Sequence, residues 1–195
     1  MVKHLLVFLT VILILAKSIF GSGFGKCPKQ EHLKNFNISR FAGRWFEIER
    51  TFYLIEVMYS CVTIEMESLS NIKLNISVVS RSRWSDGITV SEGYAIQTRR
   101  DPSTFVYKVN TKLPRLISKY LPGAGLYQII DTDYDSYAVL WSCSDYIIFY
   151  TDMLWIWGRQ KELNVTTRAN IYNILEQNEL DPERLTIPQD GNCMD

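Results

Sequence analysis

The chain has 195 residues, of which 47% are hydrophobic and 13% aromatic, and its 21 basic residues balance its 21 acidic residues. This length and composition suit one domain with a well-buried core. The even charge balance and the lack of a Lys/Arg block exclude nucleic acid as an expected partner.

The first 22 residues predict a secretory signal peptide. Lys3 and His4 precede an uncharged, apolar run from Leu5 to Ala16, and small residues follow at 21–23. A membrane-spanning helix needs about 20 apolar residues, and Lys17 ends this run too early. Cleavage removes two lysines and no acids, which leaves residues 23–195 as one domain with 19 basic and 21 acidic residues, a formal charge of −2.

Four cysteines follow the predicted signal peptide, at positions 27, 61, 143 and 193. An even number in an oxidising compartment favours disulfides, and four cysteines allow three pairings that the sequence alone does not distinguish. A fully paired set leaves no thiol for nucleophilic catalysis. Three Asn-x-Ser/Thr motifs, at Asn37, Asn75 and Asn164, predict N-glycosylation.

Period-two alternation of apolar residues predicts eight strands. The first alternates from Trp45 to Arg50, after a helical turn that Ser39 is expected to cap and a bend or close backbone approach at Gly43. Thr51 to Ser60 and 111–125 fit no strand. The remaining strands are marked by Val62, Ile64 and Met66; Ile72, Leu74, Ile76 and Val78; Tyr94 and Ile96; Phe105, Tyr107 and Val109; and the runs 126–130, 137–141 and 153–157.

The pattern becomes helical after Arg159. Ile171, Ile174, Leu175 and Asn178 recur at spacings of three and four, with Thr166 or Thr167 as the expected cap, and Asp181-Pro182 ends the helix. Eight antiparallel strands with short turns can close into a barrel that has room for one small ligand.

Three stretches in this order resemble the lipocalin family: FAGRWFEIE at 41–49, TDYDSY at 132–137 and WIWGR at 155–159. With Cys27-Pro28 and Trp141-Ser142-Cys143, the chain resembles the apolipoprotein D and Lazarillo branch of that family from residue 27 to residue 193. The resemblance implies an all-β fold: an eight-stranded antiparallel up-and-down barrel with one C-terminal α-helix packed outside.

The resemblance also implies roles for particular residues. Gly43, Trp45 and Arg159 would close the barrel floor, with the Arg159 cation over the Trp45 ring. The implied disulfides join Cys27 with Cys143 and Cys61 with Cys193. The implied ligand-binding residues, which line the cavity, are Met66, Tyr127 and Trp155, with Phe105 and Tyr107 as neighbours.

Alternation places Glu47 on the same face as Trp45. If it points inward, Glu47 either anchors a polar group of the ligand or is a buried carboxylate that needs a partner. Few other residues are suited to catalysis or metal binding. His32 is the one histidine after the signal peptide, and residues 131–135 resemble a calcium loop in which Ser136 and Ser142 replace the required Gly and Glu. We therefore expect no enzyme, no metal and no cofactor.

The sequence predicts a secreted carrier of a small hydrophobic ligand: a fatty acid, a sterol-like lipid, a retinoid or a bilin. The resemblance suggests roles in lipid transport and in protection against oxidative stress. The apolar hairpin at 145–150 is expected at the rim, where it could touch a lipoprotein or membrane surface. The alternative is a barrel filled by its own side chains that recognises a receptor or cell surface.

Overall fold

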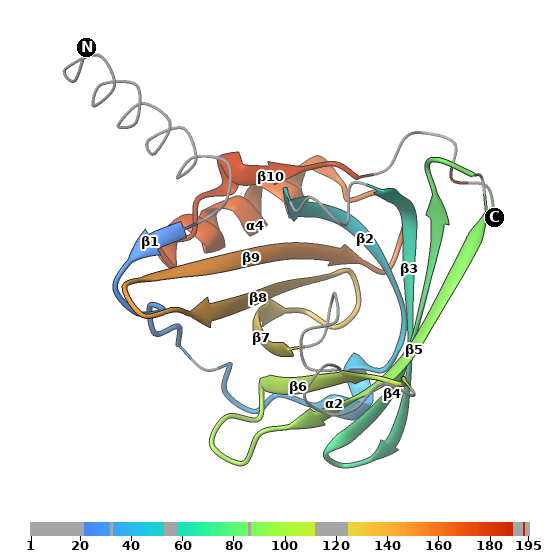
Figure 1. Ribbon diagram of the computed structural model, residues 1–195, viewed down its shortest axis with the longest axis horizontal. Coiled ribbons are helices and arrows are strands. Elements are labelled where there is room, and N and C mark those ends of the chain that lie inside the picture. Colours follow the sequence, from blue (N-terminus) through green and yellow to red (C-terminus); the bar gives the residue numbers. More distant parts are fainter. Residues whose placement is uncertain are drawn as a thin grey trace.

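The computed structural model describes residues 22–31, 33–52, 58–85, 87–111, 125–188 and 193. Eight antiparallel strands close into a barrel because β9 pairs with both β8 and β2, which confirms the predicted fold (Figure 1). Much of the two segments that fitted no strand, at 53–57 and 112–124, lies outside the described residues. The barrel strands are β2 (Gly43–Thr51), β3 (Tyr59–Ser70), β4 (Lys73–Ser82), β5 (Ile88–Gln97), β6 (Thr104–Val109), β7 (Gly125–Thr132), β8 (Tyr137–Asp145) and β9 (Phe149–Gly158).

Two short strands that were not predicted extend the sheet. β1 (Ser22–Phe24) pairs with the start of β9, and β10 (Leu185–Thr186) pairs with the end of β2. β1 pairs with residues 149–151 of β9, beyond the part of β9 that pairs with β2, and β10 pairs with residues 50 and 51 of β2, beyond the part of β2 that pairs with β3. Strands of three and two residues are too short for alternation to reveal them.

The inner face of β5 is built from small residues. Gly93 and Ala95 are buried there, whereas Tyr94 lies on the outer face with the Lys73 ammonium 4.6 Å from its ring. The prediction that Ile72 belongs to the same strand as Leu74, Ile76 and Val78 is wrong, because Ile72 lies in the turn between β3 and β4 and is 57% exposed. Small inward side chains on β5 leave space inside the barrel.

A β-bulge interrupts the alternation of β2. Glu47 pairs with Trp157 and Glu49 with Ile156, so Ile48 is an extra residue in the strand. Ile48 and Glu49 therefore both face away from the barrel interior, and the predicted alternation from Trp45 to Arg50 is wrong beyond Glu47. Glu49 instead accepts a hydrogen bond from the hydroxyl of Tyr172 at 2.7 Å and forms an ion pair with Arg168 at 2.8 Å.

The two α-helices in the described part of the chain begin at asparagines. Asn37 caps α2 (Ile38–Phe41) by accepting a hydrogen bond from the backbone N–H of Arg40 at 3.0 Å. Asn164 caps α4 (Val165–Gln177) by accepting one from the backbone N–H of Thr167 at 2.7 Å. The predicted caps, Ser39 for the first helix and Thr166 or Thr167 for the second, are wrong because these residues already lie inside their helices. A capping side chain must precede the first helical residue.

The C-terminal helix packs outside the barrel, as predicted. α4 lies against the outer side of the wall beside β9 and β10 (Figure 1). Ile171 and Leu175 of α4 are fully buried against outward-facing residues such as Val139 and Ile156. A short 3-10 helix, η2 (Pro182–Arg184), follows. Among the described residues, no helix combines the length and apolarity needed to cross a bilayer.

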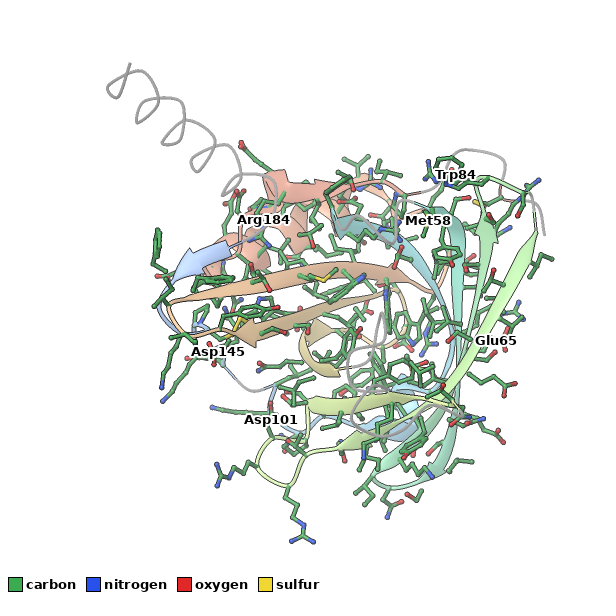
Figure 2. The ribbon with its side chains drawn as sticks, viewed as in Figure 1. Met58, Glu65, Trp84, Asp101, Asp145 and Arg184 are labelled. Carbon is green, nitrogen blue, oxygen red and sulfur yellow. A yellow bond between two sulfur atoms is a disulfide. The ribbon has the colours of Figure 1, made fainter. Side chains whose placement is uncertain are left out.

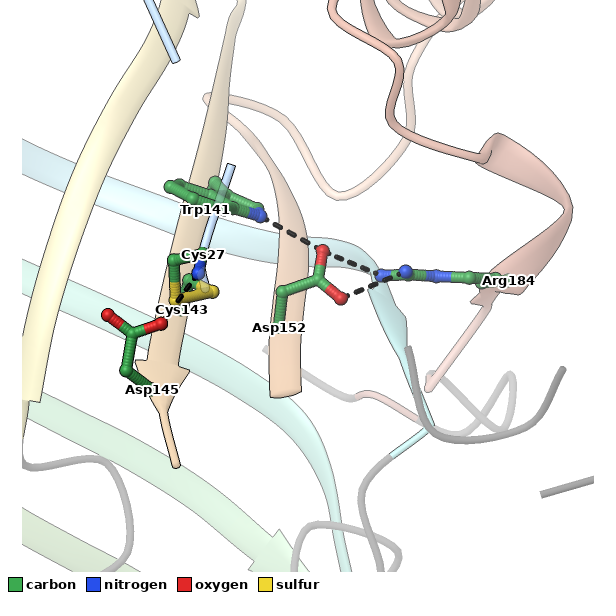
Figure 3. Close-up of a disulfide and its surroundings, with 6 residues drawn as sticks. All are labelled: Cys27, Trp141, Cys143, Asp145, Asp152 and Arg184. Carbon is green, nitrogen blue, oxygen red and sulfur yellow. Dashed lines mark hydrogen bonds and ion pairs between the residues drawn. A yellow bond between two sulfur atoms is a disulfide. The ribbon is translucent and has the colours of Figure 1, made fainter. Parts of the chain in front are cut away.

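Two disulfides tie the chain ends to the barrel, with the pairing that the resemblance implies. One joins Cys27 to Cys143 across 116 residues, and the other joins Cys61 to Cys193 across 132 residues. Beside the first, the carboxylate of Asp145 accepts a hydrogen bond from the backbone N–H of Cys27 at 2.6 Å (Figure 3).

A buried carboxylate on β9 holds the C-terminal segment against the same wall. Asp152 lies between Trp141 and Arg184 and bonds to both (Figure 3). The Trp141 indole N–H donates to Asp152 at 3.0 Å, and the Arg184 guanidinium donates to its two carboxylate oxygens at 3.0 and 3.3 Å. Buried charges are tolerated when they are paired in this way.

Candidate functional site

The interior of the barrel contains a cavity of about 420 Å³. Residues from all eight barrel strands and Phe41 of α2 line it, and most of the lining is apolar. Drug-sized ligands occupy pockets of roughly 300 to 1,000 Å³ with this kind of lining. The barrel is therefore hollow, and the cavity is the candidate site.

The five predicted ligand-binding residues all lie in the cavity wall: Met66, Phe105, Tyr107, Tyr127 and Trp155. Three of them form a continuous aromatic surface, because the ring centroids of Tyr107 and Tyr127 are 6.4 Å apart and those of Tyr127 and Trp155 are 5.2 Å apart. Phe105 and Tyr107 are two positions apart on β6, which brings both to the inner face. Their contact with a ligand stays a prediction.

One end of the barrel is closed by Trp45 and Arg159. Trp45 is fully buried, and its indole N–H donates to the Phe41 carbonyl at 2.8 Å. The Arg159 guanidinium lies 3.7 Å from the Trp45 ring centroid and donates to the carbonyls of Ala42 at 2.9 Å and Arg44 at 2.8 Å. These bonds close the floor, so a ligand would enter from the opposite end.

Gly43 makes room for this arrangement. It has a φ of 101°, and a Cβ at this position would lie 3.1 Å from a guanidinium nitrogen of Arg159. Burial lowers the pKa of Arg159, while the carboxylates of Asp135 and Asp133 act in the opposite direction. An arginine keeps its charge under such conditions, and the cation over the indole is retained.

The cavity wall also carries an ion pair. A carboxylate oxygen of Glu47 lies 2.6 Å from a guanidinium nitrogen of Arg50, and the two residues are 5% and 4% exposed. Arg50 also donates to the Tyr59 carbonyl at 3.3 Å. Of the two possibilities for Glu47, the structure shows the carboxylate with a partner, while leaving it in contact with the cavity. That it anchors a polar group of the ligand stays a prediction.

The bulge at Ile48 lets both residues face the cavity although they are three positions apart. Residues i and i+3 of a regular strand point to opposite faces, whereas the extra residue brings both Glu47 and Arg50 inward. For this reason, simple alternation does not predict Arg50 as a cavity residue. An acid and a base three residues apart within an otherwise alternating strand would have been the available signal.

Several neutral polar groups also lie in the cavity wall. Hydroxyls come from Ser80, Thr89, Ser91 and Tyr107. Burial raises the pKa of Tyr107, with an opposing contribution from the Ser91 hydroxyl, so the phenol is neutral at physiological pH. The buried indole N–H of Trp157 has no hydrogen-bond partner within the described part of the protein. These groups could give a ligand a few directional contacts in an apolar surrounding.

The described residues contain no group of three His, Cys, Asp or Glu side chains that could hold a metal ion. The turn at 133–136 overlaps the stretch 131–135 that resembles a calcium loop, but the carboxylate of Asp133 is hydrogen-bonded within the turn itself. Asp133 accepts hydrogen bonds from the backbone N–H groups of Asp135, Ser136 and Tyr137. Burial tends to raise the pKa of Asp133, but these bonds and the Ser136 hydroxyl lower it overall.

The open end of the barrel carries exposed apolar side chains. The β8–β9 hairpin presents Tyr146, Ile147, Ile148 and Phe149 to solvent, and the Tyr146 and Phe149 rings stack at 4.6 Å. The β4–β5 connection lies at this end too, where Trp84 is 83% exposed close to Met58 (Figure 2). Neither group belongs to the cavity wall.

The three predicted glycosylation sites are exposed. Asn75 lies on the outer face of β4, and Asn37 and Asn164 use their side-chain oxygens as helix caps. A glycan attaches to the side-chain nitrogen, so capping leaves the acceptor atom available. Their modification stays a prediction.

Comparisons with known proteins give consistent matches. The model of the Lipocalin / cytosolic fatty-acid binding protein family matches residues 42–192. Apolipoprotein D of Cavia porcellus is 32% identical over 178 residues, which cover 88% of this chain and 86% of that protein. Lazarillo protein of Schistocerca americana is 25% identical over 192 residues, covering 94% of this chain and 84% of that protein.

Solved structures match the fold. Insecticyanin from the tobacco hornworm Manduca sexta superposes with a TM-score of 0.73 at 19% identity, covering 89% of this chain and 90% of its own. Apocrustacyanin C2 gives a TM-score of 0.71 at 19% identity, covering 88% of this chain and 92% of its own. At this level of identity the likeness concerns the barrel alone.

Proposed function

Because the chain belongs to the Lipocalin / cytosolic fatty-acid binding protein family, we propose that it is a secreted carrier that holds one small hydrophobic molecule inside its barrel. It is a binding protein and not an enzyme. The observation that carries the proposal is the cavity of about 420 Å³, closed at the floor by Trp45 and Arg159 and walled by aromatic rings. Transfer of a ligand from water into such a cavity is favourable without any charged contact.

The size of the cavity narrows the ligand class. A cavity of about 150 Å³ holds one benzene, so 420 Å³ holds about 17 non-hydrogen atoms at the same density. Since pockets bury roughly 70 to 90% of their ligands, a molecule of about 20 to 25 such atoms fits. Fatty acids, retinoids and smaller steroids have this size, whereas a bilin is roughly twice as large. We therefore favour the first three.

Ligand titration followed by tryptophan fluorescence tests the proposal. The oxidised, delipidated protein would be titrated with a fatty acid, a steroid, a retinoid and a bilin. Ligands that absorb near the indole emission quench the fluorescence directly, and the binding of the others is measured by their displacement of a quenching ligand. Trp155 lies in the cavity wall, and Trp84 is exposed outside it. We expect saturable quenching that is reduced in Trp155→Phe and unchanged in the matched control Trp84→Phe.

The absence of saturable binding by any of these ligands would contradict the carrier function. It would favour the alternative in which the protein acts through its surface on a receptor or a neighbouring cell. The presence of this cavity argues for the carrier, because a barrel that serves only as a surface scaffold would be expected to fill its interior with side chains.

Secretion and glycosylation complete the proposal. Two disulfides fit an extracellular protein, and the three exposed sequons fit one that passes through the secretory pathway. Expression in a eukaryotic cell line should release a protein whose N-terminus lies near residue 23. Treatment with a peptide N-glycosidase should lower its mass, and replacing Asn37, Asn75 and Asn164 by Gln should abolish that change. Retention of the leader in the released protein would contradict the predicted domain boundary.

The apolar hairpin supports a contact with a phospholipid surface of a membrane or lipoprotein. Ile147 and Ile148 are exposed at the open end, where a lipid would enter. Double replacement of Ile147 and Ile148 by Ser should reduce co-sedimentation with neutral phosphatidylcholine vesicles. Val165→Ser, which removes an equally exposed aliphatic side chain at the start of α4, is the control. Equal binding by all variants would rule out this contact.

We also propose that the carrier serves lipid transport and protection against oxidative stress, as its likeness to apolipoprotein D and Lazarillo protein suggests. Transport predicts that the protein moves a bound retinoid between donor and acceptor vesicles faster than the uncatalysed exchange. Protection predicts that cells lacking the protein survive peroxide treatment less well and are rescued by the native form but not by a cavity-filled variant. Rescue by both forms would separate the protective role from ligand binding.

A further inference from the structure

Hydroxyl groups gather on the inner face of β4 and β5. Ser80, Thr89 and Ser91 all line the cavity. Ser80 and Thr89 are paired residues of the β4–β5 ladder, and Ser91 is the inward residue of β5 that follows Thr89. Building on the proposed carrier function, we infer that these hydroxyls bind the oxygen-bearing head group of an amphipathic ligand whose apolar part lies toward the floor.

The inner face of the β4–β5 ladder changes from apolar to polar along the barrel. From the floor toward the open end, the inward pairs are Leu74 with Ala95, Ile76 with Gly93, Val78 with Ser91, and Ser80 with Thr89. Leu74 is buried in the same cluster as Trp45 and Phe41 at the floor, whereas Thr89 is exposed near the β4–β5 connection. The hydroxyls therefore lie toward the end by which a ligand would enter.

The hydroxyls of Ser80 and Thr89 are available to a ligand, because neither takes part in a hydrogen bond within the described residues. Ser80 is only 9% exposed, so a ligand oxygen would satisfy a hydroxyl that is largely shielded from water. The Tyr107 hydroxyl lies close by, since a Cβ on Gly93 would be 2.7 Å from its oxygen and Gly93 is the inward residue that follows Ser91. A hydroxyl can donate and accept, so this group suits an alcohol, a carbonyl or a carboxylate.

The charged part of the lining lies on another strand and has contacts of its own. Glu47 and Arg50 of β2 are 2.6 Å apart, and Arg50 also donates to the Tyr59 carbonyl. Glu47 pairs with Trp157, whose ring centroid is 6.5 Å from that of Phe41 at the floor. A head group held by the β4–β5 hydroxyls would stay nearer the open end than Glu47.

The wall opposite the hydroxyls suits the apolar body of the ligand. In a closed barrel of eight strands, β5 lies four strands from β9 in either direction, so Gly93 and Ala95 face the side that carries Trp155. The rings of Tyr127 and Trp155 pack on that side with their centroids 5.2 Å apart. A chain or ring system would lie between these rings and the small residues of β5, with its head group at the hydroxyls of the same strand.

Two brominated fatty acids of equal length test the orientation. One carries bromine at its terminal carbon and the other beside its carboxylate, and bromine quenches a tryptophan that it contacts. In the oxidised Trp155→Phe variant, Trp157 stays in the described lining beside the floor. We expect the terminal bromine to cause the larger loss of fluorescence at saturation. An equal loss, or a larger loss with bromine beside the carboxylate, would overturn the inference.

A second experiment removes the hydroxyls and compares two ligands of equal shape. Retinol and its hydrocarbon analogue, in which hydrogen replaces the hydroxyl, are titrated by tryptophan quenching below the concentrations at which they aggregate. The triple variant Ser80→Ala, Thr89→Val, Ser91→Ala should bind retinol about tenfold more weakly and the hydrocarbon with less than about a threefold change. Thr63→Val is the matched control, because Thr63 lies on the outer face of β3 and should leave both affinities unchanged.

The outcomes separate the inference from the proposed function. If neither the fatty acids nor retinol bind the native protein, the carrier function itself fails. If retinol binds the native protein and the triple variant equally well, or if the variant weakens retinol and the hydrocarbon by the same factor, the carrier function stands and the inference is wrong. Ser80→Ala alone, which should weaken retinol about threefold, repeats the comparison if the triple variant has a lowered melting temperature.

Discussion

Placing a larger side chain on the inner face of β5 should have opposite effects on the stability of the protein and on its affinity for the ligand. Ala95 is buried on the inner face of β5 and lines the cavity, between Leu74 of β4 and Tyr107 of β6 in the sheet. Ala95→Leu adds three carbon atoms that would project into the empty space. Each buried methylene is worth about 0.8 kcal/mol, so the ligand-free protein should gain up to about 2 kcal/mol in its free energy of unfolding.

The same three carbons displace part of the ligand. If the ligand loses an equal amount of buried surface, its affinity falls by about 2 kcal/mol, or roughly 30-fold. For a domain of this size, a gain of about 2 kcal/mol raises the melting temperature by about 4 to 8 °C. Thermal unfolding followed by circular dichroism and retinol titration followed by fluorescence would measure the two effects in the same preparation.

The control is Thr63→Leu, which enlarges a side chain on the outer face of β3 beyond the cavity lining. It should leave retinol affinity unchanged. A lower melting temperature for Ala95→Leu would mean that no free space exists beside this residue, because overpacking is destabilising. That result would refute the description of the barrel as hollow at this position.

Three further predictions concern the parts that hold the barrel together. Replacing Cys61 and Cys193 by Ala opens a loop of 132 residues and should lower the free energy of unfolding by up to about 5 kcal/mol, measured by urea denaturation; a loss below about 1 kcal/mol would refute the entropic estimate. Burial and the hydrogen bond to Glu49 raise the pKa of Tyr172 to about 12, so the stabilisation from this bond is complete below pH 10 and is lost as the pH rises through about 12. Tyr172→Phe should remove this part of the loss of stability at alkaline pH. An unchanged dependence of the free energy of unfolding on alkaline pH would refute the prediction. Arg159→Met removes the cation over the floor indole together with its bonds to backbone carbonyls and should cost about 3 kcal/mol in thermal unfolding, whereas an unchanged melting temperature would contradict its role.

The barrel could be predicted from the sequence because its strands obey a simple rule. Inward residues such as Ile64, Leu74 and Phe105 recur at every second position, and the polar residues between them face solvent. The family resemblance then supplied closure and the pairing of the cysteines, which alternation does not contain. Membership in the lipocalin family and likeness to the apolipoprotein D and Lazarillo branch are confirmed by the comparisons.

The errors have local physical causes. The N-caps at Asn37 and Asn164 were missed because both residues were interpreted as glycosylation sites, although one asparagine can serve both purposes through different atoms. The face of Glu49 and Arg50 was missed because a bulge changes the phase of a strand without changing its composition. Neither the hydrophobic pattern nor the family motif records such a change.

The bulge at Ile48 has an evolutionary consequence. Without Ile48, Glu47 and Arg50 would be two positions apart in a regular strand and would still both face inward. Loss or gain of this one residue therefore leaves what the strand presents to a ligand unchanged, while Ile48 itself adds an apolar contact on the side of α4. A single-codon insertion or deletion at this position would therefore change the outer packing of the strand and leave the cavity-facing pair in place.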